Sequence, residues 1–364
     1  MSDTKKLFEP FNIGRITLKN RVGVAPMTRI SATEKGLVTD RMVKYYRSFA
    51  DGGFGLIITE GTYIDDKYSQ TYQFQPGIAY EEQAQEWKRV VDAVHSQDTK
   101  IFMQLQHTGP LSQGNRFVNE TIAPSSVQPK GEQLKFYLGE GAFRLPREIT
   151  KEEIVDVKKS FVDAAKRAKS IGFDGIELHG ANGYLLDAFL TEHTNKRNDE
   201  YGGTTENRVR LLVEIIQDVR EAVGENFTVG IRISQSKVND YAYKWSAKEH
   251  DAKTIFGALG KSGLDFIHVT EFEAWKPAFD TGKDSLAVLA KKYSQLPIIV
   301  NGQLEKPERA SKMINNGDAD MVTLGKGALA NHDWVKKVKN GEPLKEFDKE
   351  KVLHPVADIK DFEL

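Results

Sequence analysis

The stretch FDGIELHGANGYLLDAF, residues 173–189, passes from an apolar segment through a polar turn into a second apolar segment. Residues 173–179 are short and largely apolar, which predicts a strand, and a helix is predicted to begin near Tyr184. The preceding segment predicts another helix, because Thr150 and Glu153 fit a capping box and Gly172 fits the helix end. Helices on both sides of a short apolar strand are typical of a parallel sheet.

The same alternation of strand and helix continues along the whole chain. Apolar runs predict eight strands, at residues 21–26, 54–60, 100–106, 173–179, 227–234, 264–270, 296–300 and 319–325, and amphipathic segments predict a helix after each. Eight such units in 364 residues predict an α/β protein, a closed (β/α)8 TIM barrel in a single domain over residues 1–364. A doubly wound open sheet is the less favoured alternative, because no GxGxxG motif follows the first strand.

Two segments lie outside this repeat of strand and helix. Residues 11–21, FNIGRITLKNR, predict an N-terminal hairpin that caps the amino-terminal mouth of the barrel. Residues 109–147 form a long polar excursion after the third strand, with too few apolar residues for a core of its own. We therefore expect a decorated loop there and not a second domain.

The composition excludes several classes of protein. A formal net charge of −1 gives no overall positive field, so neither nucleic acid nor a membrane surface is expected as a partner. The chain has no cysteine, which excludes disulfides, thiolate zinc sites and cysteine-bound iron–sulfur clusters, and no metal site is expected. No apolar run approaches the ~20 residues that span a bilayer. Residues 1–11 lack the apolar core of a secretory signal, so a cytoplasmic location is expected.

Three polar residues are predicted to face the interior of the barrel near its catalytic mouth. Active sites of such barrels lie at the carboxyl ends of the strands, and alternation along the strands puts Gln104, His179 and Arg232 on the inward face. Each has an ordinary structural alternative: a backbone partner for Gln104, a satisfied structural role for His179, and Glu177 as the partner of Arg232. Three such residues on adjacent strands favour a planar polar ligand, because buried polar groups need partners.

The turns after the last two predicted strands indicate a phosphate site. Residues 300–304 read VNGQL, and residues 324–330 read LGKGALA. Glycine lets backbone N–H groups approach a phosphate and lysine adds positive charge, so Gly302, Gly325 and Lys326 are the predicted contacts. TIM barrels often bind phosphate at this place.

These motifs, in this order, resemble the Old Yellow Enzyme family of flavin-dependent ene-reductases. The resemblance rests on PMTR at 26–29, QL at 104–105, HGANGYLLDAFL at 179–190, NKRNDEYGG at 195–203, ENR at 206–208 and GIRIS at 230–234. It covers essentially the whole chain, and HxxNxYL followed by NxRxDxYGG is highly specific. The resemblance implies a TIM barrel that binds FMN at its catalytic mouth and takes electrons from NADPH or NADH.

The resemblance also implies a role for each matching residue. The cofactor contacts that it implies are Ala25, Pro26, Met27, Thr28, Gly61, Gln104, Arg232, Gly302, Gly325 and Lys326. His179 and Asn182 would hold the carbonyl oxygen of a substrate while a hydride adds to its β-carbon, and Tyr184 would donate a proton to the α-carbon. A tyrosine with the ordinary pKa of about 10 stays protonated at neutral pH, which suits a proton donor. The acceptor implied is a small molecule: an activated alkene or, alternatively, a nitro compound or a quinone.

Several positions depart from the family pattern. Lys326 stands where an arginine is usual, and a lysine cannot make the planar, bidentate contact of a guanidinium. Gln106 stands where a tryptophan is common and would alter the substrate-binding pocket, and Glu192 and His193 replace a Ser-Pro pair. The physiological acceptor, the preference between NADH and NADPH, and the oligomeric state, with a homo-oligomer among the options, stay open. A flavin-free, phosphate-binding lyase or isomerase is the alternative function.

Overall fold

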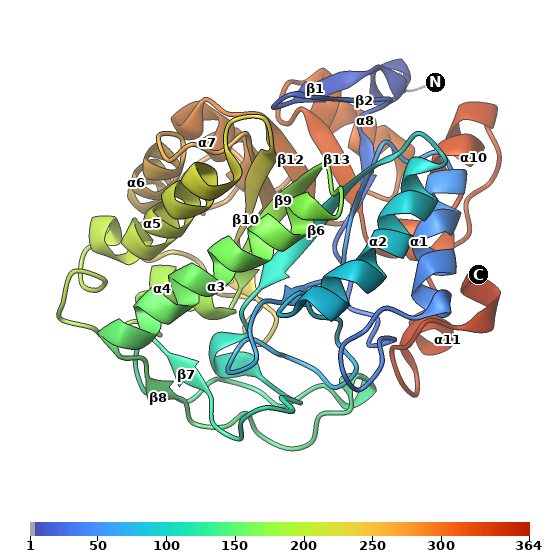
Figure 1. Ribbon diagram of the computed structural model, residues 1–364. Helices are drawn as coiled ribbons and strands as arrows, with labels where there is room; N and C mark the ends of the chain where they lie inside the picture. Colours follow the sequence, from blue (N-terminus) through green and yellow to red (C-terminus); the bar gives the residue numbers. More distant parts are fainter. Residues whose placement is uncertain (1–3) are drawn as a thin grey trace.

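The computed structural model describes residues 4–364. Residues 1–3, at the start of the segment predicted to lack a secretory signal, lie outside the described residues. Its main sheet is a closed parallel barrel (Figure 1). The strands in order are β4 (Leu56–Ile58), β3 (Val22–Val24), β13 (Met321–Leu324), β12 (Ile298–Asn301), β11 (Phe266–Thr270), β10 (Thr228–Lys237), β9 (Gly175–Asn182) and β6 (Lys100–Gln106). Pairing of β4 with β6 closes the ring, and β5 (Thr62–Tyr63) continues along β6. The predicted TIM barrel is confirmed, and the open-sheet alternative is wrong.

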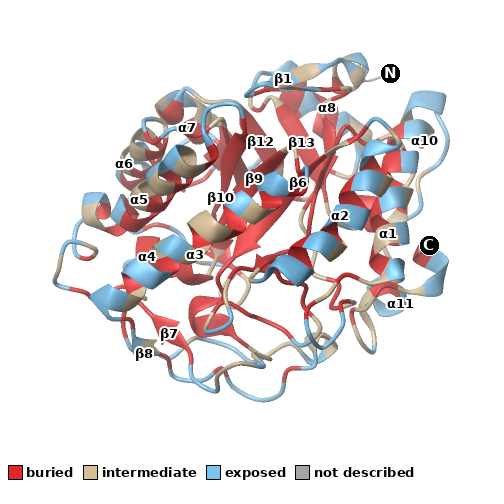
Figure 2. Cartoon of the chain, viewed as in Figure 1, coloured by how far each residue is buried: buried red, intermediate tan, exposed pale blue. Residues whose placement is uncertain are grey.

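Helices surround the barrel, with buried residues toward the strands and exposed residues on the outer side (Figure 2). The longer ones are α1 (Asp40–Asp51), α2 (Glu81–His95), α3 (Lys151–Ser170), α5 (Thr205–Val223), α6 (Glu249–Leu259), α7 (Leu286–Ser294) and α8 (Pro307–Asn315). The shorter ones are α4 (Leu185–Leu190), α9 (Lys326–Ala330), α10 (Trp334–Asn340) and α11 (Lys349–Leu353). The predicted capping box at the start of α3 is present, because the Thr150 side chain accepts from the Glu153 N–H and the Glu153 side chain accepts from the Thr150 N–H.

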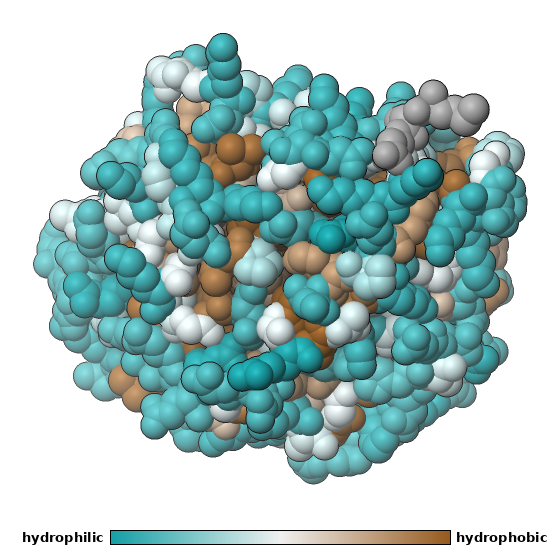
Figure 3. Space-filling model, turned by 90° about the horizontal axis from the view of Figure 1, so that it is seen from above, coloured by the Kyte–Doolittle hydropathy of each residue, from teal (hydrophilic) through white to brown (hydrophobic). Residues whose placement is uncertain are grey.

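The interior of the barrel is apolar at its amino-terminal end. Strands β1 (Phe11–Ile13) and β2 (Ile16–Leu18) form the predicted hairpin, at the end of the barrel opposite the excursion (Figure 1). Ile13 and Leu18 pack on the inward side chains Leu56, Ile58, Phe102, Phe266, Ile299 and Met321. Met103 and Leu105 of β6 belong to the separate apolar layer beneath the helices, which confirms the predicted inward and outward faces. Seen from the hairpin side, the outer surface is mainly hydrophilic (Figure 3).

Two strands run further toward the catalytic mouth than the sequence predicts. Strand β9 continues to Asn182 and β10 to Lys237, and a shift in register pairs these two residues. The Val238 N–H donates to the Asn182 carbonyl at 3.1 Å, and the Asn182 N–H donates to the Ser234 hydroxyl at 2.9 Å. The extension of β10 therefore holds the turn that follows β9.

The excursion after β6 covers part of the catalytic mouth. It contains the 3-10 helices η2 (Gly109–Leu111) and η3 (Lys135–Tyr137), and β7 (Ile122–Ala123) pairs parallel with β8 (Arg147–Glu148). Leu111 and Phe143 pack against Tyr184. The Arg197 guanidinium, from the NKRNDEYGG segment, donates to the carbonyls of Pro124 and Ile149 at 3.2 and 2.8 Å. That segment therefore fixes the excursion in place.

A buried ion pair ties the end of the chain to the loop after β3. The side chains of Arg29 and Glu363 are each 1% exposed, and the two guanidinium nitrogens donate to the carboxylate at 2.5 and 2.7 Å. Glu363 lies in the last 3-10 helix, η4 (Asp361–Glu363). The Arg29 N–H donates to the Glu60 carboxylate at 3.0 Å, and burial raises the pKa of Glu60 to about 7. The C-terminal segment is thereby joined to the loops after the first two barrel strands.

The first prediction concerns this ion pair. Glu363→Ala leaves the Arg29 guanidinium buried without its anionic partner, so we expect the free energy of unfolding to fall by about 3–5 kcal/mol. Asp361→Ala is the matched control, because Asp361 pairs with Arg41 in the same segment but the two side chains are 91% and 41% exposed. An exposed pair is worth about 0–1 kcal/mol. Urea denaturation measures both, and equal losses would contradict the assignment of Glu363 as the buried anchor.

Candidate active site

A cavity of about 320 Å³ opens at the carboxyl ends of the strands and brings most of the predicted site residues together. Those that line it are Pro26, Met27, Thr28, Gly61, Gln104, Gln106, His179, Asn182, Tyr184, Arg232, Gly325 and Lys326. They come from loops and strand ends that are far apart in the sequence, and a single side of the barrel collects them.

Two predicted residues, Ala25 and Gly302, do not line this cavity. The Ala25 N–H donates to the Leu324 carbonyl at 3.0 Å and joins the end of β3 to the end of β13. Gly302 has a φ of 141°, and a β-carbon there would lie 2.1 Å from the Glu271 carbonyl oxygen. Only glycine fits at that close approach of two backbones.

A buried carboxylate organises the polar part of the cavity. Glu177 accepts a hydrogen bond from the Gln104 amide at 2.8 Å, and the His268 Nδ1 atom lies 2.7 Å from its other oxygen. The other ring nitrogen of His268 lies 2.8 Å from the Thr323 hydroxyl. The Gln104 amide therefore hydrogen-bonds to a side-chain carboxylate, and not to a backbone group as its structural alternative had it.

Arg232 is not hydrogen-bonded to Glu177, contrary to the structural alternative for this residue. Its Nη2 atom donates to Thr270 at 3.2 Å and to Asn301 at 3.1 Å, and burial lowers its pKa. Its Nε atom is buried without a hydrogen-bond partner among the described residues. An unpaired cationic N–H is costly in a protein interior, so the geometry suits a ligand with a hydrogen-bond acceptor or a negative charge.

His179 is held as a neutral imidazole beside the cavity. Burial lowers its pKa well below the ordinary value, and the positive charge of Arg232 lowers it further. The Nδ1 atom accepts from the Ala181 N–H at 3.4 Å, which leaves Nε2 to carry the proton. The ring meets that of Tyr184 edge-on, with centroids 4.8 Å apart. His179 is thus a hydrogen-bond donor that adds no positive charge.

The turn from Asn182 to Tyr184 is fixed by a second buried ion pair. Asn182 has a φ of 66°, in the left-handed region that asparagine tolerates. The Gly183 N–H donates to one oxygen of Asp187 at 2.6 Å, and the Lys237 ammonium donates to the other at 2.6 Å. The side chains of Lys237 and Asp187 are 7% and 0% exposed. The extension of β10 therefore supplies the cation that holds the turn.

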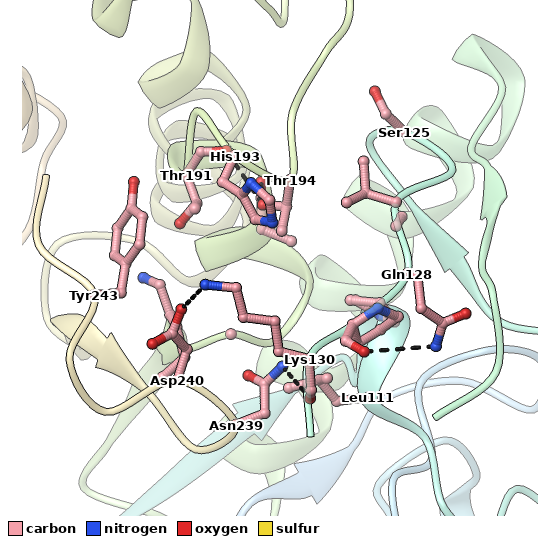
Figure 4. A pocket seen from close by; sticks show the side chains of 17 residues that line it. Leu111, Ser125, Gln128, Lys130, Thr191, His193, Thr194, Asn239, Asp240 and Tyr243 are labelled. Atoms are coloured by element: carbon pink, nitrogen blue, oxygen red, sulfur yellow. Dashed lines mark hydrogen bonds and ion pairs between the residues drawn. The ribbon is translucent and has the colours of Figure 1, made fainter. Parts of the chain in front are cut away.

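A smaller cavity of about 40 Å³ lies behind this turn, between the excursion and the end of β10 (Figure 4). His193 and Tyr243 line it, and Lys130 pairs with Asp240 beside it (Figure 4). Glu192 accepts a hydrogen bond from Ser246. Glu192 and His193, which replace the Ser-Pro pair of the family, do not line the active-site cavity.

Gln106 lies in the active-site cavity next to Gly61. Its amide donates to the Thr71 hydroxyl at 2.6 Å. A β-carbon at Gly61 would lie 1.6 Å from the Gln106 side-chain oxygen, so glycine at this position makes room for the glutamine. The position where many members of the family carry tryptophan is therefore a polar wall of the cavity.

Sequence reasoning did not anticipate several residues of the site. Thr270 and Asn301 end strands β11 and β12, where the strand-end rule that found Arg232 could have found them. Tyr72, in the loop after β5, carries no periodic signal. The same is true of the lining residues that the excursion and the C-terminal region supply: Leu134, Phe136, Tyr137, Phe347 and Leu353.

Metal clusters and membrane-spanning helices are absent from the described part of the chain. Among residues 4–364, His, Asp and Glu side chains form no group of three or more that could hold a metal ion. Within the same range, no helix has both the length and the apolar character needed to cross a bilayer.

The model of the NADH:flavin oxidoreductase / NADH oxidase family matches residues 6–345. The chain belongs to this family. It is 36% identical over 352 residues to a probable flavin mononucleotide-dependent alkene reductase of Leishmania infantum, covering 94% of this chain and 92% of that protein. It is also 36% identical over 350 residues to an NADH oxidase of Thermoanaerobacter brockii, but there it spans only 52% of the relative's length.

Solved structures of Old Yellow Enzymes have the same fold. The old yellow enzyme from Trypanosoma cruzi superposes with a TM-score of 0.86 at 31% identity, covering 97% of both chains. Morphinone reductase in complex with tetrahydroNAD gives a TM-score of 0.82 at 32% identity, covering 94% of this chain and 92% of that one. The resemblance to the Old Yellow Enzyme family is confirmed, and the chain is a flavin oxidoreductase whose cofactors are FMN and a nicotinamide nucleotide.

The cavity of this family member fits FMN on structural grounds. The unpaired Nε of Arg232 offers a donor to an electron-rich ring edge. A β-carbon at Gly325 would have the Met27 sulfur as its nearest neighbour, at 3.7 Å, so the backbone there is open to approach. Lys326 is exposed at the rim of the cavity, where its charge can meet a phosphate.

The second prediction tests the ion pair behind the turn. Lys237→Met leaves the buried Asp187 carboxylate without its cation, so we expect a loss of about 3–5 kcal/mol in the free energy of unfolding at pH 8. Burial already raises the pKa of Asp187, and losing Lys237 raises it further. A carboxyl group whose folded pKa is raised loses stability as the pH rises through that pKa, so the deficit should shrink as the pH falls toward 5.

The control for this prediction is Lys130→Met, which removes the cation of the neighbouring, more exposed pair with Asp240. It should cost less than about 1 kcal/mol at any pH in this range. Urea denaturation at several pH values measures both variants. A deficit for Lys237→Met that does not depend on pH would argue against a charged pair.

Proposed function

We propose that this chain is an ene-reductase, which reduces the carbon–carbon double bond of an α,β-unsaturated carbonyl compound with electrons from NADH or NADPH. The observation that carries the proposal is the convergence of His179, near the end of β9, with Asn182 and Tyr184 of the rigid turn that follows, on the cavity that fits FMN. Bound FMN would supply the redox chemistry, accepting a hydride from the reduced nicotinamide and delivering one to the β-carbon of the alkene.

His179 and Asn182 are proposed to bind the carbonyl oxygen of the acceptor. As a hydride adds to the β-carbon, the electron pair of the double bond moves toward this oxygen, which gains negative charge. The neutral His179 ring can donate from Nε2, and the Asn182 amide can supply a second donor. Fixed donors of this kind stabilise a developing oxyanion without reorganisation.

Tyr184 is proposed to complete the reduction by donating its phenolic proton to the α-carbon. The residue is 5% exposed, and burial raises its pKa above the ordinary value. It is therefore protonated at neutral pH and available as a general acid. Addition of hydride and then of this proton converts the alkene into the saturated carbonyl compound.

The FMN contacts of the cavity-lining residues are proposed from the same geometry, and those of Ala25 and Gly302, which do not line the cavity, from the family resemblance. Pro26, Met27 and Thr28 would lie along the isoalloxazine, Gln104 and Arg232 would meet its polar pyrimidine edge, and the turns with Gly302, Gly325 and Lys326 would hold the phosphate. Ala25 and Gly61 would allow close approach of the ring. Membership of the flavin oxidoreductase family removes the reason for the flavin-free lyase or isomerase. A single domain over residues 1–364 and a cytoplasmic location stay predictions.

The third prediction tests the proposed reaction itself. The purified protein should bind FMN with a yellow colour, lose that colour when NADH or NADPH is added without oxygen, and regain it when 2-cyclohexenone follows. Stopped-flow absorbance separates the two half-reactions, and chromatography identifies cyclohexanone as the product. Bleaching without reoxidation by any activated alkene would leave a flavin oxidoreductase and overturn the ene-reductase proposal.

The fourth prediction concerns the proton donor. Tyr184→Phe should slow reoxidation by cyclohexenone roughly a hundredfold, because general acid catalysis typically contributes a factor of about 10²–10⁴. Reduction by NADH should change little, since that half-reaction needs no proton on carbon. Rapid mixing measures both rates, and an equal loss in the two half-reactions would argue against Tyr184 as the acid.

A further inference from the structure

The hydroxyl of Tyr184 already has a partner inside the cavity. The hydroxyl oxygens of Tyr72 and Tyr184 lie 2.9 Å apart, and these residues are 4% and 5% exposed. Tyr72 comes from the loop after β5, which pairs with β6, the strand next to β9 and the turn that carries Tyr184. Both residues line the active-site cavity.

Tyr72 is held in position by side chains of its own loop. The Gln75 side-chain oxygen accepts from the N–H groups of Thr71 and Tyr72 at 2.7 and 3.4 Å, and its amide donates to the Gly61 carbonyl at 2.6 Å. The Gln70 amide donates to the Tyr72 carbonyl at 2.9 Å. This backbone is therefore fixed by specific hydrogen bonds on both sides of Tyr72.

The Tyr72 side chain is also fixed by packing. Its ring lies 4.6 Å from that of Tyr137, with an angle of 45° between their planes. The Tyr137 hydroxyl donates to the Thr28 carbonyl at 3.4 Å. Because the loop and the ring are both held, the Tyr72 hydroxyl is fixed in its orientation.

A buried phenol that gives up its proton needs such a neighbour. In the proposed reaction Tyr184 becomes a phenolate in a site from which most water is excluded, and an unsolvated charge there would be costly. A hydrogen bond to a charged group is stronger than one between neutral groups, so a donor at 2.9 Å stabilises the phenolate more than the phenol. The Tyr72 hydroxyl is placed to be that donor.

We propose that Tyr72 is a positioning residue that strengthens Tyr184 as an acid and returns a proton to it. This inference rests on the ene-reductase function proposed above. The O–H bond of Tyr184 breaks as its proton goes to the α-carbon. As the Tyr72 proton moves to the Tyr184 oxygen, a water molecule in the cavity gives a proton to Tyr72 and leaves as hydroxide, so no free Tyr72 phenolate forms. No electrons are exchanged in these steps.

The surroundings of the pair make Tyr184 the stronger acid of the two. Burial raises the pKa of Tyr184, whereas hydrogen bonds from Tyr72 and Gln106 lower it. Burial raises the pKa of Tyr72 well above the ordinary value, and the neighbouring Tyr184 raises it further. Tyr184 is therefore the member of the pair that loses its proton first. The other titratable or charged groups that face the pair are Tyr137, His179, Arg232 and Tyr241.

The fifth prediction is that Tyr72→Phe slows the reoxidation of the reduced enzyme by cyclohexenone at least tenfold, as expected when one hydrogen bond to a charged group is lost. It should leave reduction by NADH unchanged. The loss of a donor raises the pKa of Tyr184, so the alkaline limb of the pH–rate profile for reoxidation should move to higher pH. A purely structural role for Tyr72 would lower the rate without moving that limb.

Tyr63→Phe is the matched control. Tyr63 is also buried, and its hydroxyl donates to the Lys35 carbonyl at 3.3 Å and accepts from the Gln83 amide at 2.6 Å, outside the active-site cavity. NMR of protein labelled at the tyrosine ζ-carbon, with Tyr184 assigned from the Tyr184→Phe spectrum, follows the titration directly. This readout does not depend on turnover.

The outcomes separate the two proposals. If Tyr184→Phe is slow but Tyr72→Phe reoxidises at the normal rate with an unmoved alkaline limb, the role of Tyr72 is overturned and the ene-reductase function stands. If Tyr184→Phe itself reoxidises normally, the proposed proton donor is wrong, and the inference about Tyr72 falls with it. A slow Tyr72→Phe variant with an unmoved Tyr184 titration also overturns the inference.

Discussion

The carboxylate of Glu177 is the interaction on which the polar interior of this barrel depends. It is fully buried, and its partners come from two other strands: Gln104 on β6 and His268 on β11. His268 continues the network to Thr323 on β13. A buried carboxylate without partners would be strongly destabilising, so these hydrogen bonds fix the rotamers of Gln104 and His268. They also leave Arg232 to hydrogen-bond Thr270 and Asn301, with its Nε–H free for a ligand.

Two buried ion pairs likewise fix loops around the mouth of the barrel. Asp187 and Lys237 hold the turn with Asn182 and Tyr184 from below, and Glu363 holds Arg29 in the loop after β3. In each case one partner comes from a segment remote in the sequence. Such pairs add little net stability compared with apolar packing, but they are costly to break. They therefore specify one arrangement of loops that would otherwise have many.

The catalytic mouth is built from strand ends and from loops outside the repeat of strand and helix. Strand ends supply Gln104, His179 and Arg232, whose positions follow from the pleat of the barrel. The excursion after β6 and the loop after β5 supply Tyr137 and Tyr72, which meet over Tyr184. In the proposed function, the strand ends would meet the flavin and these loops would surround the acceptor. Gln106 ends strand β6, and its hydrogen bond to Thr71 joins it to the loop after β5.

The barrel follows from the amino-acid sequence alone, because strand and helix periodicities are local properties of the chain and eight repeats of them allow few folds. The inward faces of β6, β9 and β10 also follow from the sequence, since side chains alternate along any strand. The partners of the buried polar side chains follow from the tertiary structure. Glu177 contacts Gln104 and His268 instead of Arg232. The extension of β10 places Lys237 against Asp187, and the loop after β5 places the Tyr72 hydroxyl next to that of Tyr184. Those contacts join residues separated by tens to hundreds of positions, and their distances depend on how the loops close and not on any local pattern.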